Sequence, residues 1–600
     1  MRAWTHHRTN QLLAAAASIV LLCALPVVVP AQSSGALTAD TILYDGKLWT
    51  VDPARPEADA IAIAGDTILR VGSNAEILSL RGPGTRVLDL HGARVLPGFN
   101  DAHTHFENAT QWFYEARLID VRSEDLLKAR IAEAAQRVPA GMWITAYDAG
   151  GMAAWSALKD TGVSLQPLQP TLSDLDAAAG DHPLLIRRYD GVAFLNSMAM
   201  AIVRLNDRVA DPKGGRYGRD PLTHQLNGAL YGKAVDQVSN ILPPATMASR
   251  LIAARGVLHT LSSVGITSIH DIARLDAISQ LQTYNADIER SYTDVNIFRN
   301  LEQQGQLTVR VYAYQPLRSS AQLAGFGIRP GTGDRLLRFG ILKEFVDGGW
   351  MLAPYANRPD YSGDVTFRFT SDEDERRMIR EADRAGWDIG IHTIGDRALS
   401  TVLDWYSDME KANGERPDRR DRIVHMWYAN PDLIRRAGQM HLIADITPFQ
   451  LLSDTRSVDK LAGPERAKWA FAWRSMIDAG MKLDIVSDMP GLYNRTEVSP
   501  VNPLENMYYA ITRKTAPGQP GWHPEQCITL KEAIEAYTIN PAYASHEEKV
   551  KGSLEAGKLA DLVVLSNDIL SAPPEQLLTT RVLLTMLGGS VVYRDPISEW

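Results

Sequence analysis

Cysteine is nearly absent from this sequence, since only Cys23 and Cys527 occur among 600 residues. A framework of disulfides is therefore excluded, and stability must come from core packing, which a chain of this length can supply. An excess of positive charge is also missing, because the net charge is −9, and this argues against a nucleic-acid surface. With 45% hydrophobic and 22% charged residues, the composition is typical of a soluble globular protein.

The N-terminus differs in kind from the rest of the chain. Arg2 and Arg8 precede an apolar run, residues 12–25, and Val29-Pro-Ala31 follows it. This order of basic, apolar and small residues predicts a signal peptide, residues 1–31, cleaved after Ala31. The alternative is an uncleaved membrane anchor, but the run is shorter than the roughly 20 residues that a span needs. We expect an exported protein, periplasmic or secreted, with no stable membrane anchor.

Both ends of the remaining chain contain short strands separated by turns with glycine. They predict one small β-sandwich domain composed of residues 38–96 and 547–600. Between these ends, apolar strands alternate with longer helical patterns, which predicts an α/β fold, a (β/α)8 barrel over residues 97–546. The strand candidates are 95–105, 266–271, 309–314, 339–347, 389–395, 423–427, 443–448 and 483–490. The long gap after the first strand predicts an insertion at about 140–250 over the barrel mouth.

Two histidines end the first predicted barrel strand, in Val95-Leu-Pro-Gly-Phe-Asn-Asp-Ala-His-Thr-His105. In an extended strand, side chains two residues apart share a face, so His103 and His105 present their imidazoles together, with Asp101 on the same face. Alone, such a pair is typical of surface or core histidines. Together with other ligands at the same rim, it predicts half of a divalent metal site.

Four further strands have metal-binding or acid/base side chains near their C-terminal ends: Lys343, His392, His425 and Asp488. The active site of a (β/α)8 barrel lies at the C-terminal ends of its strands, so the barrel would bring these groups to one rim. Each has an ordinary alternative. A lysine can reach up to solvent, a histidine after valine can be a hydrogen-bonded core residue, and Ser-Asp before Met-Pro can be a turn.

With these residues, the chain resembles the metal-dependent amidohydrolases. Within them it resembles family 3, the group of N-substituted formamide deformylase-like and YtcJ-like proteins. The matching motifs cover nearly all of the chain after residue 31. They are Leu96-Pro-Gly-Phe-Asn-Asp-Ala-His-Thr-His, Asn196-Ser, Gly265-Ile-Thr-Ser-Ile-His-Asp, Lys343-Glu-Phe-Val-Asp-Gly, Ile391-His-Thr-Ile-Gly-Asp-Arg-Ala, Ile423-Val-His, Ser487-Asp-Met-Pro and Gly557-Lys-Leu-Ala-Asp-Leu-Val-Val-Leu.

The resemblance implies a role for each residue. His103 and His105 would bind a first metal ion, His392 and His425 a second, and Lys343, carboxylated by CO2, would bridge the two. Asp488 would contact the first metal and act as the proton shuttle. One or two Zn2+ ions suit these ligands, although Mn2+, Fe2+, Co2+ and Ni2+ stay open. Bound water would then be activated to attack a substrate carbonyl.

Substrate contacts are less defined, because the chain departs from the family pattern there. Val192, Val424 and Thr447 stand where relatives often have other groups, and Gly349-Trp350 follows the strand-four motif. His270, Trp350, Tyr355 and Trp427 are candidates for substrate contact. An orienting or packing role is the alternative for His270, and core or loop packing for the aromatic residues.

These features predict an exported metal-dependent hydrolase that cleaves amide-type C–N bonds in a small molecule. A deaminase or a lactonase on the same scaffold is the alternative among enzymes, because activated water and Asp488 serve either reaction. A catalytically silent ligand-binding protein is the alternative of another class, and it gives no reason for the chain to contain all six ligands. Homo-oligomerisation and the role of the insertion stay open.

Overall fold

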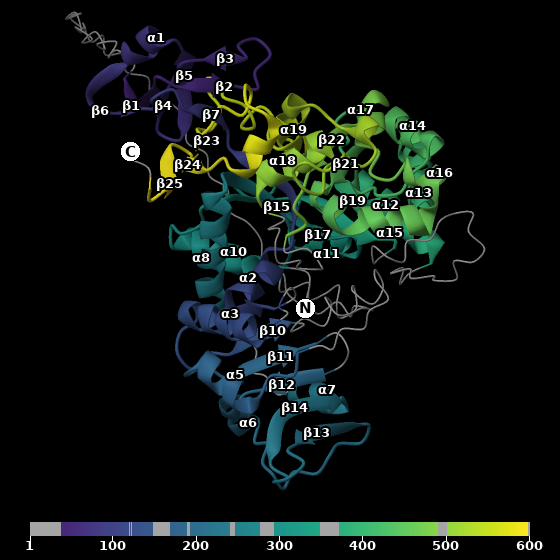
Figure 1. Cartoon of the computed structure of the whole chain (residues 1–600). Coiled ribbons are helices and arrows are strands. Elements are labelled where there is room, and N and C mark those ends of the chain that lie inside the picture. Colours follow the sequence, from purple (N-terminus) through teal and green to yellow (C-terminus); the bar gives the residue numbers. More distant parts are fainter. Residues whose placement is uncertain are drawn as a thin grey trace, which may run out of the picture.

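The computed structural model describes residues 38–118, 121, 123–147, 168–188, 192–239, 246–275, 293–347, 371–489 and 501–597. The predicted signal peptide and the predicted substrate residues Trp350 and Tyr355 lie outside these residues. Figure 1 shows three parts: a β domain of purple and yellow segments, a barrel of teal to yellow-green segments, and a blue extension. Within the described ranges, no helix is long and apolar enough to cross a membrane.

The central part is a barrel of eight parallel strands in chain order, which confirms the predicted fold. They are β8 (Phe99–Thr104), β15 (Ile266–Arg274), β17 (Arg310–Pro316), β18 (Leu337–Phe345), β19 (Asp388–Thr393), β20 (Arg422–His425), β21 (Ile443–Ile446) and β22 (Lys482–Ile485). The segment after β22 closes the barrel onto the first strand. The amide of Asp488 donates to the carbonyl of His103 at 3.0 Å, and the amide of His105 donates to the carbonyl of Met489 at 2.6 Å.

The first predicted strand is divided in two. Its first half, β7 (Arg94–Pro97), pairs within the β domain, and its second half, β8, opens the barrel. The change falls at Gly98, where a Cβ atom would lie 2.3 Å from Oγ1 of Thr267. Only glycine lets the chain pass so close to β15, and so this residue fixes where the β domain ends and the barrel begins.

Helices pack around the barrel on the apolar face that their sequences predict. The principal ones are α8 (Met247–Ser263), α10 (Val295–Gln303), α12 (Asp372–Arg384), α13 (Asp396–Asn413), α14 (Pro431–Gln439), α17 (Trp473–Asp478), α18 (Pro503–Thr512) and α19 (Leu530–Ala536). Helix α12 is typical: Ser371 caps its N-terminus, its first turn is acidic, and Ile379 and Ala382 are buried. Acidic side chains in the first turn stabilise the helix through its dipole, and the buried apolar face packs the helix against the sheet.

The β domain joins the two ends of the chain, as predicted. One sheet has the order β5 (Thr67–Gly72), β4 (Ala60–Ala64), β1 (Ala39–Tyr44), β6 (Arg81–Asp89). The other has the order β25 (Ser590–Arg594), β24 (Val582–Leu587), β23 (Leu562–Leu565), β7, β2 (Lys47–Trp49), β3 (Glu57–Ala58). Their facing side chains form one apolar core, which includes Leu43, Ile61, Val564 and Leu584. A buried ion pair ties this domain to β17, with Nε of Arg310 2.7 Å from Oδ2 of Asp561.

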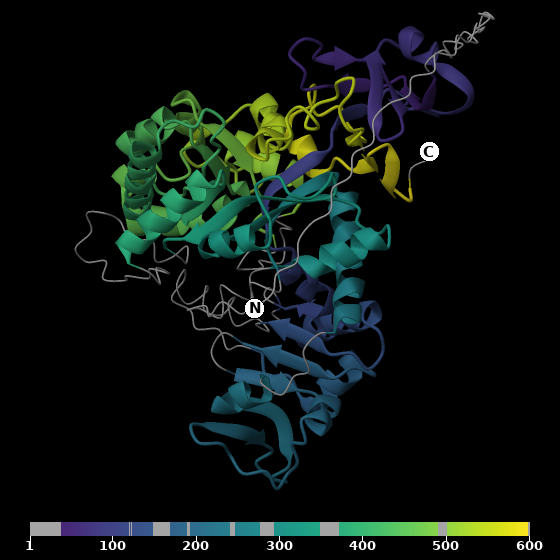
Figure 2. The same cartoon turned by 180° about the vertical axis from the view of Figure 1, so that it is seen from behind.

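The extension between β8 and β15 has its own sheet, seen below the barrel in Figures 1 and 2. Its order is β13 (Gly215–Arg219), β14 (Leu226–Gly232), β12 (Val192–Leu195), β11 (Leu184–Arg187), β10 (Ile144–Tyr147), β9 (Glu115–Arg117). Helices α3 (Glu124–Arg137) and α5 (Leu172–Ala179) pack on it through Leu127, Ile131 and Leu175. The first strand of this sheet in the chain is β9, so the extension starts before the insertion that was predicted at about 140–250.

Candidate metal centre

Three predicted ligands meet where the barrel closes. Nε2 of His103 lies 3.4 Å from Oδ1 of Asp488, and Nε2 of His105 lies 3.3 Å from the same oxygen. The three donor atoms lie within 4.8 Å of one another, close enough to share a metal ion. Asp488 has a φ of 50°, a left-handed conformation that is uncommon for residues other than glycine. Such a backbone is typical of functional sites, because surrounding structure must hold it in place.

Asp101 holds this junction together. Its Oδ1 accepts hydrogen bonds from the amide of Ser487 at 3.0 Å and the amide of His103 at 3.3 Å. It therefore links the first strand to the segment after the last one. Burial raises the pKa of Asp101 to about 7, against the lowering effect of these hydrogen bonds. Its hydrogen bonds to the backbone on both sides of the junction indicate a positioning role rather than that of a third ligand beside the two histidines.

The other two histidines complete a cluster of imidazoles. The ring centroids of His392 and His425 are 4.6 Å apart, and those of His103 and His425 are 5.5 Å apart. Strand alternation would place His425 on the same face as Ile423, which packs in the core that the helices cover. His425 instead has a φ of 76°, which breaks the alternation and lets its ring meet the other two.

Lys343 points into the barrel from β18. Its side chain is 0% exposed, and Nζ has no hydrogen-bond partner among the described residues. The alternative of a lysine that reaches solvent is therefore wrong. Nζ lies 4.9 Å from the ring centroid of Phe345, which in turn lies 5.3 Å from that of His392. Burial lowers the pKa of Lys343 to about 7, although Asp445 and Asp488 raise it in part.

These residues fit a divalent metal ion. Burial lowers the pKa of His103, His392 and His425 well below the usual range, so the imidazoles are neutral and can donate a lone pair. Burial acts against the charge of Asp488, but His425, His105 and Lys343 hold its pKa below the ordinary value. Several of these buried donor atoms lack hydrogen bonds within the described structure: both ring nitrogens of His103, Nε2 of His392, Nδ1 of His425 and Oδ1 of Asp488.

Two predicted substrate residues have other surroundings. His270 is 0% exposed, and its Nδ1 lies 3.0 Å from Nη2 of Arg422 on the floor of the barrel. Trp427 is 3% exposed and donates from Nε1 to Oγ1 of Thr447 at 3.0 Å. Direct substrate contact therefore stays a prediction for both residues. Their positions support the alternatives, an orienting role for His270 and core packing behind His425 for Trp427.

Sequence reasoning missed a layer of buried polar residues beneath the imidazoles. Arg422, Tyr314, Asp445 and Asp484 are all 0% exposed and lie on four different barrel strands. Oδ1 of Asp445 and Oδ2 of Asp484 each lie 3.7 Å from Nη1 of Arg422. A polar residue at an inward position of an apolar strand is the signal that could have found them, because a lone buried charge is costly.

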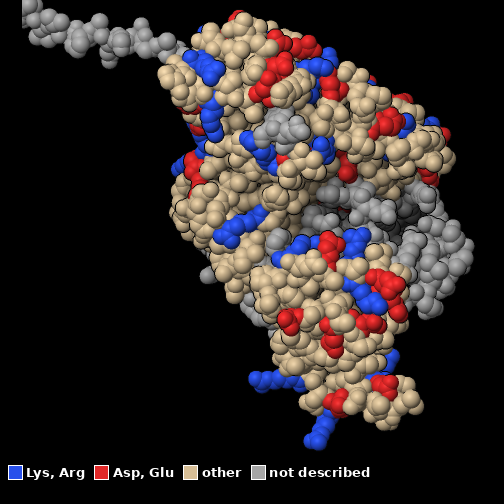
Figure 3. Space-filling view, turned by 60° about the vertical axis from the view of Figure 1, so that its left-hand side comes forward, with Lys and Arg blue, Asp and Glu red and all other residues tan. Residues whose placement is uncertain are grey.

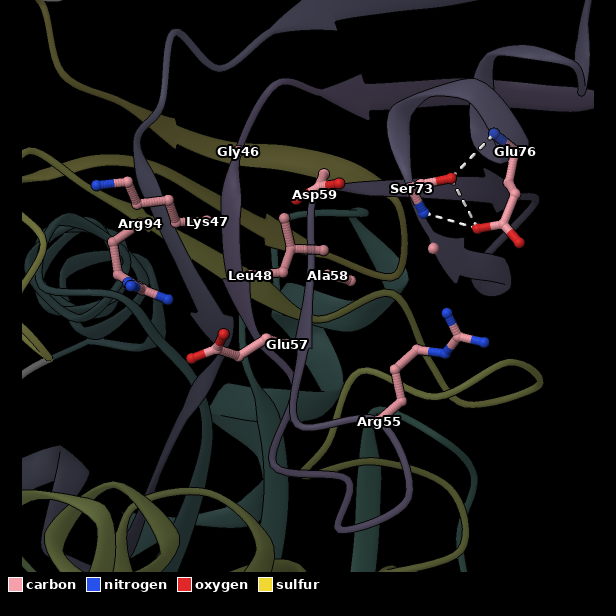
Figure 4. A pocket seen from close by; sticks show the side chains of 11 residues that line it. Gly46, Lys47, Leu48, Arg55, Glu57, Ala58, Asp59, Ser73, Glu76 and Arg94 are labelled. Atoms are coloured by element: carbon pink, nitrogen blue, oxygen red, sulfur yellow. Dashed lines mark hydrogen bonds between the residues drawn. The ribbon is translucent and has the colours of Figure 1, made fainter.

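Outside the barrel rim, the surface in Figure 3 and one pocket on the β domain show how charged side chains are distributed. Figure 3 shows acidic and basic side chains interspersed on one face of the molecule. A pocket of about 410 Å3 lies on the β domain, and Lys47, Arg55, Glu57 and Arg94 line it (Figure 4). Lys47 and Arg94 both pair with Asp568, at 3.2 and 2.6 Å. This pocket contains none of the predicted metal ligands.

A (β/α)8 barrel with histidines, a lysine and an aspartate at the exits of its strands defines a metal-dependent hydrolase. The model of the amidohydrolase family matches residues 86–593, so the chain belongs to that family and acts on C–N bonds. It is 28% identical to the protein LONG AFTER FAR-RED 3 of Arabidopsis thaliana, over 93% of this chain and 92% of that one.

Two further comparisons agree with this assignment. The chain is 26% identical to an N-substituted formamide deformylase of Arthrobacter pascens, over 92% of this chain and 98% of that one. A metal-dependent hydrolase from Pyrococcus furiosus has the same fold, with a TM-score of 0.64 and 22% identity, over 88% of this chain and 100% of that one. The family resemblance and the fold inferred from the sequence are therefore confirmed.

Proposed function

We propose that this enzyme hydrolyses an amide-type C–N bond of a small molecule, with Asp488 as the proton shuttle. The observation that supports it most is the position of Asp488, whose Oδ1 lies within 3.4 Å of Nε2 of both His103 and His105. A carboxylate beside the metal ligands and at the barrel mouth can exchange protons with both water and substrate.

His103, His105 and Asp488 would hold a first divalent ion and His392 and His425 a second, and carboxylated Lys343 would be a ligand of both. We propose Zn2+ because imidazole and carboxylate ligands suit it. A bound ion would supply Lewis acidity and lower the pKa of water toward about 7. The low pKa of Asp488 leaves it ionised at neutral pH, ready to accept a proton. It then returns this proton to the leaving nitrogen, and the aspartate is regenerated.

Carboxylation of Lys343 is part of the proposal. A pKa of about 7 leaves much of the amine unprotonated at neutral pH, and this is the form that attacks CO2. A bond forms between Nζ of the neutral amine and the carbon of CO2, one C=O π bond of CO2 opens, and one N–H proton leaves, so the neutral amine becomes an anionic carbamate ligand. Mass spectrometry of the folded protein should detect an added CO2 that is lost on acidification. An unmodified amine at full metal occupancy would contradict this step.

The name of the Arthrobacter relative points to N-substituted formamides as the first substrates to test. We propose a panel of N-formyl, N-acyl and cyclic amides, with amidines and lactones for the deaminase and lactonase alternatives, assayed with added Zn2+. Release of an amine and a carboxylic acid supports the proposal. Release of ammonia from amidines or opening of lactones alone would favour an alternative, and binding without any turnover would favour the ligand-binding protein.

Export of the enzyme is a separate proposal that rests on residues 1–31. N-terminal sequencing of the protein expressed in a Gram-negative host tests it. A periplasmic chain that begins at residue 32 is the expected result, and an intact N-terminus in the cytoplasm would contradict it.

A further inference from the structure

The layer beneath the metal centre has one residue at its middle. Arg422 is 0% exposed, and its guanidinium reaches several segments of the barrel. Nη1 donates to Oη of Tyr314 at 2.7 Å, and Nη2 donates to the carbonyl of Ala544 at 2.9 Å and lies 3.0 Å from Nδ1 of His270. The planar fork of an arginine can hold such separate partners in a fixed geometry.

Tyr314 connects this guanidinium to the rim. Its hydroxyl donates to the carbonyl of Ala102 at 2.9 Å, directly before His103 in the chain. Its ring centroid lies 5.8 Å from that of His103, with an angle of 62° between the planes, an edge-to-face contact. The tyrosine therefore contacts both the backbone that leads to His103 and the imidazole itself.

His103 depends on such contacts more than metal-binding histidines usually do. A histidine ligand is normally oriented by a hydrogen bond from its second ring nitrogen to a carboxylate or a carbonyl. Nδ1 of His103 has no hydrogen-bond partner among the described residues, although it is buried. The orientation of the ring must therefore come from the surrounding rings and from its backbone.

We propose that Arg422 and Tyr314 act as a positioning pair that fixes His103 from beneath and so sets the affinity of the centre for its metal ion. Arg422 fixes the hydroxyl of Tyr314, and Tyr314 fixes the backbone and the ring of His103. This inference rests on the proposed role of His103 as a metal ligand, and it adds two residues that touch neither metal nor substrate.

Tyr314→Phe is the variant that tests the pair. It keeps the ring that packs on His103 and removes the hydroxyl between Arg422 and Ala102, which leaves only the longer direct bond from Nη1 of Arg422 to the carbonyl of Ala102 at 3.4 Å. Tyr406→Phe is the matched control, because Tyr406 is also fully buried and its hydroxyl donates to the carbonyls of Ile389 at 3.0 Å and Arg422 at 3.2 Å. Tyr406 lies on α13, on the helix side of the sheet. Both variants lose a buried hydroxyl that bonds to barrel backbone.

The measurement is Zn2+ affinity of the full chain, by competition with a chromophoric chelator, together with the Tm of the metal-free protein. We expect Tyr314→Phe to weaken Zn2+ binding about tenfold, the lower end of the range for residues that orient ligands. Tyr406→Phe should bind Zn2+ like the wild type, even where both variants lower the metal-free Tm equally. Equal Zn2+ affinity in Tyr314→Phe and the wild type would overturn the inference.

Arg422→Lys provides a second variant for the case that Tyr314→Phe does not fold. It keeps a positive charge beside Asp445 and Asp484 but removes the fork, and it should weaken Zn2+ binding as well. Wild-type affinity in this variant would also overturn the inference. A wild-type protein that binds no Zn2+ would contradict the proposed function itself, so the two failures are distinguishable.

Discussion

The two ends of the barrel both bury charged residues but treat them differently. At the N-terminal end, Asp388 accepts hydrogen bonds from the amide of Arg420 at 3.0 Å and from the guanidinium of Arg416, and its Oδ2 lies 2.6 Å from Nε2 of His546. At the C-terminal end, Lys343 is just as buried, yet its Nζ has no hydrogen-bond partner within the described ranges.

This difference distinguishes a buried charge that stabilises the fold from a buried group that belongs to the metal centre. Stability favours hydrogen-bond partners for buried polar groups, and Asp388 at the N-terminal end follows that rule. The C-terminal end departs from it at the predicted ligands, and His425 and Asp488 also have left-handed backbone conformations there. Buried groups left without partners, in strained backbone, indicate a site completed by a ligand that the chain does not itself supply.

The sharpest comparison makes the same substitution at both ends, and Asp488→Asn should have the largest effect. It removes the proton acceptor while it keeps the side-chain volume, so kcat should fall about 10³-fold, as for loss of a general acid–base group. Metal content should stay near the wild-type value because the histidines remain. Steady-state kinetics and metal analysis check this, and near-normal turnover would exclude Asp488 as the proton shuttle.

Asp388→Asn should have the opposite pattern. It removes the buried carboxylate that pairs with both Arg416 and His546, although Nη1 of Arg416 still lies 3.4 Å from Oδ1 of Asp383, so the free energy of unfolding should fall by about 2 kcal/mol. Chemical denaturation measures this loss. The kcat/KM per folded molecule should not change, because the residue lies at the far end of β19 from His392. A large loss of kcat/KM with normal stability would remove the contrast between the two ends.

Trp427→Phe should have the smallest effect, and it distinguishes core packing from substrate contact for this residue. The variant loses the bond from Nε1 to Thr447, which costs about 1 kcal/mol of stability. KM should stay close to the wild-type value, because the indole packs in the core. Kinetics with the best substrate of the panel check this, and a large rise in KM with an unchanged Tm would show that Trp427 contacts substrate.

Sequence reasoning could predict the barrel, its eight strands and the residues at its rim because these follow from local patterns. Strand periodicity identifies apolar strands, and the barrel topology then dictates that Lys343 and Asp488 approach the same rim. The break of β7 from β8 at Gly98 was also marked by the Pro-Gly pair that precedes Phe99.

The layer beneath the rim could not be predicted in the same way. In the sequence, Arg422 has the pattern of an ordinary charged residue at the start of a strand. Its hydrogen-bond partners lie on β17, β15 and α20 (Ile539–Ala544), which are far apart in the sequence. The inward turn of His425 depends on one backbone angle that strand alternation does not reveal. The burial of Trp427 was missed for the same reason, since burial is set by packing between distant elements.

Metal content tests the central claim most directly. We predict that the purified wild type contains at least one transition-metal ion per chain, measured by inductively coupled plasma mass spectrometry after dialysis against metal-free buffer. A His103→Ala/His105→Ala variant that retains the wild-type circular dichroism spectrum should contain almost none. A folded wild-type protein without stoichiometric metal, or a double variant that keeps all of it, would contradict the assignment of the rim as a metal centre.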